Sequence, residues 1–198
     1  MVKGHLINPD GTVMTFISLG RLDAEQEAVV RNFITGYNVH DLGAGQLGIA
    51  NQLSDLGAHT VTAVDKDYAG NLDRYTDRRP NVNLVGEYFE EYAKHGHFID
   101  VAFVCWPECY EQQGLVQLIH NVRIVIYLGS NFDGTACGST EFWETMKRRE
   151  VLAAVPDRWN SLIVYAGQKW IARRPLPEEY AGLHRSGPHY AYGADLVV

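Results

Sequence analysis

Three glycines and one carboxylate around a single predicted turn have the residue types and spacing to hold a ligand. The stretch VHDLGAGQLGIANQL carries the pattern G-x-G-x-x-G at Gly43, Gly45 and Gly48. Such glycines let the backbone approach a ligand closely, and the pattern is typical of turns that bind the pyrophosphate of a dinucleotide. Asp41, two residues before the first glycine, argues against phosphates. Two like charges about 4 Å apart cost on the order of 4 kcal/mol at an effective dielectric of about 20.

A second acid narrows the choice of ligand. Asp65 ends the next predicted strand, where a carboxylate can accept hydrogen bonds from both hydroxyls of a ribose. S-adenosylmethionine contains adenosine but no phosphate, and it carries a positive sulfonium and a positive ammonium group. Asp41 would attract both charges. The residues therefore favour a cationic adenosyl ligand over a dinucleotide such as NAD(P), although the glycine pattern and Asp65 are compatible with an oxidoreductase.

Predicted strands and helices alternate from residue 37 onward. We expect strands over residues 37–42, 60–64, 82–85, 99–106, 122–128 and 161–166. We expect helices over residues 24–35, from the glycines to 56, and over 68–76, 88–94, 107–119 and 139–152. This alternation predicts an α/β fold with a doubly wound, mostly parallel twisted sheet and helices on both faces. In such folds ligands bind outside the carboxyl ends of the strands.

The ends of the chain do not follow this alternation. Residues 1–20 are predicted to form an N-terminal hairpin or extension around the turn NPDG, and residues 21–172 to form the cofactor-binding domain. Residues 173–198 are rich in Pro, Gly and Tyr. They are either an irregular tail or include a last strand near residues 191–197. A chain of 198 residues is long enough to bury a core in one domain.

At these positions the sequence resembles the class I S-adenosylmethionine-dependent methyltransferases, which have a Rossmann-like fold. The matching stretches are DLGAG, the following LGIANQLSDLGA, and VTAVDKD. Further along, VGEYFEEY places Glu87 where the family often has an acid near the adenine, and FIDVAFVCWPEC resembles the element beside the transferred methyl group. The resemblance covers about residues 24–166. It implies methyl transfer to an acceptor that the sequence does not identify.

The resemblance and the positions beside its motifs give a predicted site. The cofactor residues are expected to be Asp41, Gly43, Gly45, Asp65, Lys66, Glu87, Tyr88 and Cys105. Trp106 and Glu108 are expected to lie near the acceptor and carry the catalytic role. Trp106 can form a wall or stack on a cation, but it can equally be a core residue at the end of a strand. Glu108 can act as a base, or it can simply favour the first turn of a helix.

Other readings of this region concern the cysteines and one long loop. Cys105 and Cys109 could suggest a metal, but structural zinc sites normally show C-x-x-C pairs, and a cysteine on an apolar strand is more often a buried small hydrophobe. No metal is expected. Residues 129–138 exceed the usual length of a connection, so we expect a substrate-facing loop there.

Charge and cysteine content restrict the expected partners and the expected location of the protein. The formal net charge is -7 and the pI about 5.6, which argues against a nucleic-acid substrate. The CWPE sequence also lacks the second proline of the motif that amino-group methyltransferases use on bases. Three cysteines and no long apolar run predict a cytoplasmic protein without a membrane segment. We expect a small-molecule acceptor, or one presented by a partner; a non-catalytic scaffold with the same pocket is the alternative.

Overall fold

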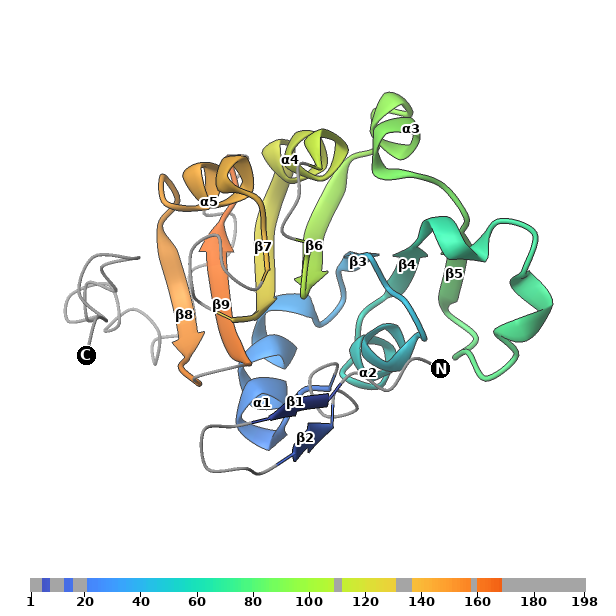
Figure 1. Ribbon diagram of the computed structural model, residues 1–198, viewed down its shortest axis with the longest axis horizontal. Helices are drawn as coiled ribbons and strands as arrows, with labels where there is room; N and C mark the ends of the chain where they lie inside the picture. The colour runs from blue at the N-terminus through green and yellow to red at the C-terminus, as the bar shows by residue number, and fades with distance from the viewer. Residues whose placement is uncertain are drawn as a thin grey trace.

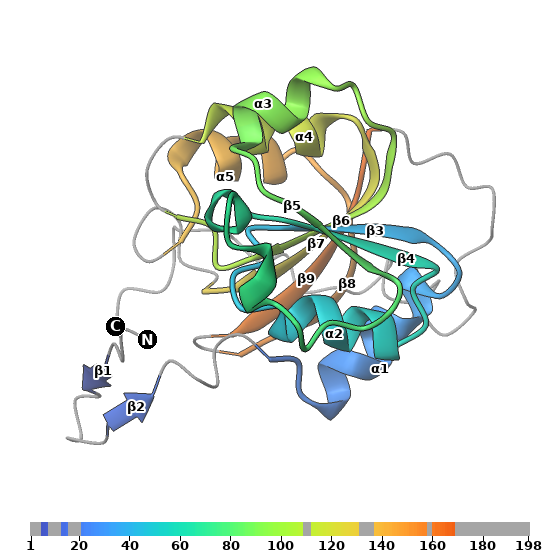
Figure 2. The same cartoon turned by 90° about the vertical axis from the view of Figure 1, so that its right-hand side faces the viewer.

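Seven strands form one twisted sheet, and the helices cover both of its faces (Figures 1 and 2). The computed structural model describes residues 5–7, 13–15, 21–108, 112–130, 137–157 and 160–168. The strand order is β5-β4-β3-β6-β7-β9-β8. The strands are β3 (Asn38–Leu42), β4 (Thr60–Val64), β5 (Val82–Val85), β6 (Ile99–Cys105), β7 (Val122–Gly129), β8 (Val151–Val155) and β9 (Ser161–Ala166). Strand β9 runs in the opposite direction to the other six strands of this sheet, so its pairs with β7 and β8 are antiparallel and the remaining pairs are parallel.

The helices divide between the two faces. Figure 2 shows α1 (Ala24–Ile34) and α2 (Gly48–Asp55) on one side of the sheet, and α3 (Phe89–Lys94), α4 (Gln113–His120) and α5 (Thr140–Met146) on the other. Two short 3₁₀ helices, η2 (Lys66–Tyr68) and η3 (Leu72–Arg74), follow β4. The prediction of a doubly wound, mostly parallel sheet is confirmed.

Two apolar layers hold the helices to the sheet. Alternate strand residues such as Val39 and Phe103 pack in the layer toward α1 and α2, whereas Leu42 and Val104 belong to the layer toward α3, α4 and α5. Strands β6 and β7 are buried along almost their whole length on both faces, which explains why they read as continuous apolar runs. The predicted bounds of β4, β5 and β9 match the structure.

The start of α1 forms as the sequence predicts. The Asp23 carboxylate accepts a hydrogen bond from the backbone nitrogen of Gln26 at 2.9 Å. The Gln26 side-chain oxygen accepts one from the backbone nitrogen of Asp23 at 3.1 Å. This reciprocal capping box satisfies two amide groups that the helix leaves open. Strands β1 (His5–Ile7) and β2 (Val13–Thr15) pair antiparallel.

The helix predicted over residues 139–152 is wrong in its second half. Helix α5 ends at Met146, and residues 151–155 form the edge strand β8. Lysine and arginine at 147–149 favour helix locally, but the apolar residues Leu152, Ala153 and Val155 are buried in the sheet's core layer, and Ala153 and Val155 pair with β9. Strand β9 therefore pairs antiparallel with β8 on one side and with β7 on the other.

Two other predicted helices need correction. The helix over 68–76 is two 3₁₀ turns, separated by Gly70 at φ +70°. The helix predicted from residue 107 begins only at Gln113, because residues 106–108 continue away from β6 as a loop. In that loop, the Pro107 carbonyl accepts a hydrogen bond from the backbone nitrogen of Gly138 at 2.8 Å.

Some predicted features lie outside the described residues. They are the centre of the expected loop at 131–136, Cys109, and the tail from 173 onward with its possible strand at 191–197. Across the described ranges, no helix combines the length and the apolar character needed to span a membrane.

Candidate functional site

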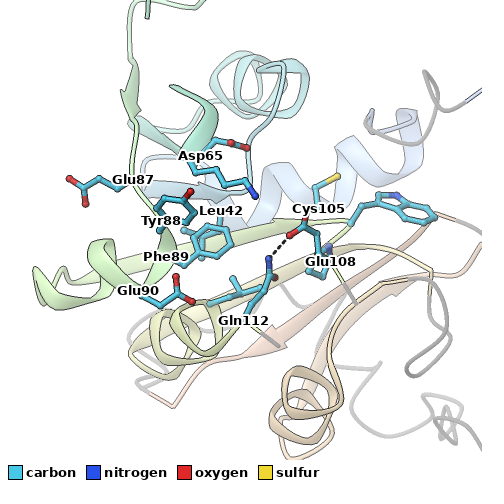
Figure 3. A pocket seen from close by; sticks show the side chains of 14 residues that line it. Leu42, Asp65, Glu87, Tyr88, Phe89, Glu90, Cys105, Glu108 and Gln112 are labelled. Carbon is cyan, nitrogen blue, oxygen red and sulfur yellow. Dashed lines mark hydrogen bonds between the residues drawn. The ribbon is translucent and has the colours of Figure 1, made fainter. Parts of the chain in front are cut away.

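A cavity of about 340 Å³ opens at the carboxyl ends of β3, β4, β5 and β6 (Figure 3). Its lining residues are Leu42, Gly43, Asp65, Lys66, Glu87, Tyr88, Phe89, Glu90, Cys105, Trp106, Pro107, Glu108, Gln112 and Leu115. The structure therefore brings together all the predicted site residues except Asp41 and Gly45. The volume suits a ligand of small-molecule size.

The glycine turn lies beside Asp65, and Gly43 of this turn lines the cavity. Gly43 and Gly45 both have positive φ, at +85° and +51°, a region that side chains other than glycine adopt rarely. One oxygen of Asp65 accepts a hydrogen bond from the Gly45 backbone nitrogen at 3.0 Å, and the other accepts one from Asp67 at 2.9 Å. The Tyr68 hydroxyl donates to the Gly45 carbonyl at 2.9 Å. The turn is thus held by residues that follow β4.

Asp65 has a second role. Its side chain caps η2 by accepting a hydrogen bond from the Asp67 backbone nitrogen. Each oxygen of the Asp65 carboxylate has one described hydrogen bond and can accept another. Because Asp65 lines the cavity, it can hold the turn and accept from ligand hydroxyls together.

Asp41 lies within the sheet rather than on the cavity wall. Side chains alternate along β3, so Asp41 faces the layer opposite to its cavity-lining neighbour Leu42. It is fully buried, and within the described part of the chain neither carboxylate oxygen has a hydrogen-bond partner. Burial, with a smaller contribution from the negative charge of Asp65, raises the pKa of Asp41 to about 8. An uncompensated buried carboxylate next to a ligand turn is a group that a bound cation would stabilise.

The β5–α3 connection carries the wall around Glu87 and Tyr88. Glu87 Oε2 lies 3.0 Å from His95 Nε2, and the ring of Tyr88 lies 6.0 Å from Lys66 Nζ. Figure 3 shows Glu87 at the outer part of the site and Phe89 next to Leu42. Phe89 also reaches the turn, since its ring lies 3.7 Å from where a Cβ on Gly43 would be.

Gly86 sets the position of this wall, which gives a stability prediction. A Cβ on Gly86 would lie 2.5 Å from the backbone nitrogen of Ala69. Gly86→Ala should therefore lower the free energy of unfolding by about 1–3 kcal/mol, because backbone has to shift. Urea denaturation measures this. The control is Gly96→Ala, where nothing lies within 4 Å and only the φ of +65° opposes a side chain. A loss no larger than that of the control would contradict the close approach.

The residues at and after the end of β6 form another part of the cavity wall. Trp106 has φ +49°, an uncommon conformation for a bulky residue, and its backbone nitrogen donates to the Leu128 carbonyl at 2.8 Å. Glu108 Oε2 accepts from Gln112 Nε2 at 3.2 Å, the contact dashed in Figure 3. Burial raises the pKa of the Cys105 thiol, so this cysteine stays protonated and is a wall rather than a nucleophile.

Sequence reasoning missed several residues of the site. They are Leu42, Phe89, Glu90, Pro107, Gln112 and Leu115. Phe89 and Glu90 follow directly after the predicted Glu87 and Tyr88, so their adjacency was the available signal. No such signal was available for Gln112 and Leu115, because the predicted helix began at residue 107 and not at Gln113.

The cavity wall is strongly acidic. Among the lining residues that the structure describes, the charged side chains are Asp65, Glu87, Glu90 and Glu108, with Lys66 as the one ammonium group. Glu90 accepts a long hydrogen bond of 3.3 Å from the Gly114 backbone nitrogen, and Glu87 is near His95. Such a wall attracts positive ligands and repels phosphates.

Comparison with known proteins supports the fold. No protein-family model matches the sequence, and no curated protein matches it. Among solved structures, the N-methyltransferase NodS from Bradyrhizobium japonicum WM9, in complex with S-adenosyl-L-homocysteine, is similar with a TM-score of 0.54 and 11% identity, over 73% of this chain and 87% of that one. The precorrin-6y C5,15-methyltransferase from Geobacter metallireducens GS-15 gives 0.51 and 16%, over 77% and 92%. Protein 1320 of Thermoplasma acidophilum gives 0.53 and 16%, over 69% and 78%. The chain has the Rossmann-like fold of the class I methyltransferases.

Proposed function

We propose that this chain binds S-adenosylmethionine in the cavity at the carboxyl ends of β3 to β6 and transfers its methyl group to a small acceptor. One observation carries the proposal. The glycine turn, Asp65 and an acidic wall meet in one cavity on a fold that methyltransferases share. A ligand with ribose hydroxyls and positive charge complements each of these features.

The charge of the site favours this ligand over a dinucleotide. Four carboxylates and one ammonium group line the cavity among the residues that the structure describes. A pyrophosphate would add two negative charges to this environment. At an effective dielectric of about 20, each like pair about 4 Å apart costs on the order of 4 kcal/mol. The same argument disfavours a nucleic-acid strand as acceptor.

The residues of the cavity fit the roles that methyl transfer needs. When bound, S-adenosylmethionine supplies a methyl group on a positive sulfur. Asp65 would hold the ribose hydroxyls, and Glu87 would lie toward the adenine. Trp106 would limit the space in which the acceptor moves, so that orientation supplies much of the rate. Glu108 would take the proton when the acceptor must lose one, since its carboxylate lies on the cavity wall.

Isothermal titration calorimetry of the purified chain tests the cofactor assignment. S-adenosylmethionine and S-adenosylhomocysteine should bind with a Kd on the order of micromolar, whereas NAD should not bind measurably. Binding of NAD alone would contradict the proposal and make the acidic wall incidental to the ligand.

Turnover separates an enzyme from a binding module. Release of S-adenosylhomocysteine would be followed with sets of small amines, thiols and phenols as acceptors. With the first active acceptor, Glu108→Gln should lower kcat while leaving the Kd for S-adenosylmethionine nearly unchanged, because Glu108 lies at the acceptor end. Binding without turnover on any set would favour the non-catalytic module instead.

A further inference from the structure

Asn160, just before β9, connects three segments that are distant in sequence. Its side-chain oxygen accepts from Trp106 Nε1 at 3.2 Å, and its side-chain nitrogen donates to the Arg21 carbonyl at 3.4 Å. Its backbone nitrogen donates to Asp157 Oδ1 at 2.8 Å, and its carbonyl accepts from Gln26 Nε2 at 2.7 Å. All four polar groups of this residue therefore have a described partner.

The Gln26 contact ties Asn160 to a rigid element. Gln26 is only 1% exposed and belongs to the capping box of α1 with Asp23. Its side-chain oxygen is bound to the Asp23 backbone nitrogen while its nitrogen holds the Asn160 carbonyl. The position of Asn160 is therefore set by the start of α1, on the sheet face opposite to α3 and α4.

Trp106 needs such support. A non-glycine residue at positive φ costs about 1–3 kcal/mol and persists only where its surroundings hold it. The Leu128 carbonyl fixes the Trp106 backbone, and Asn160 holds the far end of the indole through its only N–H donor. Trp106 is thus a lining residue of the cavity whose backbone nitrogen and indole nitrogen are both held by hydrogen bonds.

We infer that Asn160 is a positioning residue which, through Trp106 Nε1, holds the indole as the cavity wall against the positive sulfur of the cofactor. This inference rests on the proposed function. The face of an indole attracts a cation, and the attraction requires the ring to keep its place. A held Trp106 therefore favours S-adenosylmethionine, which is charged at sulfur, relative to the neutral thioether of S-adenosylhomocysteine.

Calorimetry with both ligands on Asn160→Ala tests the inference. The Kd for S-adenosylmethionine should rise about fivefold, while the Kd for S-adenosylhomocysteine changes by less than about twofold. The double variant Trp106→Phe/Asn160→Ala should bind S-adenosylmethionine no more weakly than Trp106→Phe alone, because both changes remove the same hydrogen bond. Asn51→Ala is the matched control. Asn51 also bridges two loop groups, Arg79 N and the Asp77 carbonyl, but it does not line the cavity.

The outcomes separate the inference from the proposed function. Suppose that the wild type binds both ligands. If Asn160→Ala then weakens the binding of both ligands equally, or leaves the binding of both unchanged, the inference is overturned and the proposed function stands. If wild type binds neither ligand, both are overturned.

A second measurement decides if Asn160→Ala does not fold. In the NMR spectrum of the wild type, the Trp106 indole N–H is the signal that Trp106→Phe removes. It should exchange slowly with solvent and shift when S-adenosylmethionine is added. Exchange at the rate of an exposed indole, or no shift on addition, would overturn the inference.

Discussion

Replacing Asp65 with alanine should lower the affinity for S-adenosylmethionine by about a hundredfold. Two effects add. The ligand loses the acceptor proposed for its ribose hydroxyls, and the Gly45 backbone nitrogen loses the oxygen that holds the glycine turn at 3.0 Å. Titration calorimetry measures the change directly. Asp65→Asn keeps one oxygen acceptor, so its loss should be smaller, about tenfold.

Asp67→Ala is the matched control for this prediction. Asp67 is two residues away and exposed, and its side chain does not line the cavity. Its backbone nitrogen still donates to Asp65 after the substitution, so the cap of η2 is retained. Equal losses in Asp65→Ala and Asp67→Ala would show that the general negative charge of this segment, rather than the Asp65 carboxylate, matters for binding.

Without ligand, the free energy of unfolding of Asp41→Asn should increase relative to that of the wild type as the pH rises. Burial raises the pKa of Asp41 from 3.8 in the unfolded chain to about 8 in the folded protein. Between these values the folded state keeps a proton that the unfolded state releases, so stability falls as pH rises from 3.8 to about 8. Asparagine does not ionise, and the variant lacks this loss. Its advantage over wild type should grow by about 2 kcal/mol between about pH 6 and about pH 8.

Urea denaturation of both proteins at several pH values measures the difference. Taking the difference between variant and wild type cancels the titration of all other groups that the substitution leaves unchanged. Asp73→Asn, at an exposed position on η3 outside the cavity, is the control and is measured over the same pH range. A flat difference for Asp41→Asn would mean that the Asp41 carboxylate ionises freely in the folded protein.

The raised pKa of Asp41 also predicts how ligand binding depends on pH. A bound cation favours the ionised form of Asp41, so S-adenosylmethionine should bind more tightly as pH rises toward about 8, with release of a proton. Calorimetry in buffers of different ionisation enthalpy measures this proton release. Asp41→Asn should abolish it.

The sheet could be predicted well from the sequence because its signals are local. Strands β4, β5 and β9 are short apolar runs bounded by polar or glycine residues, and their predicted ends match the structure. The ends of parallel strands meet at one edge, so Gly43, Asp65 and Trp106 could be expected together without knowledge of the side-chain contacts.

The errors arise where tertiary contacts outweigh local preference. Strand β8 follows a segment of good helix formers, and only its pairing with β9 makes it a strand. The start of α4 is delayed by Trp106 at positive φ and by the hydrogen bond from Gly138 to Pro107, which no pattern announces. Asp41 was placed on the correct strand end, but the alternation of side chains turns it away from the cavity.

The hydrogen bond from Gly45 to Asp65 joins residues 20 positions apart, and it makes the glycine turn dependent on the neighbouring strand. A fragment containing only β3, the turn and α2 would lack this oxygen and the Tyr68 hydroxyl that holds the Gly45 carbonyl. We therefore expect affinity for the proposed ligand to be acquired only when β4 has docked beside β3. Bound ligand would then protect the assembled sheet as a unit, so a saturating ligand should slow proteolytic cleavage after β4 as well as within the turn itself.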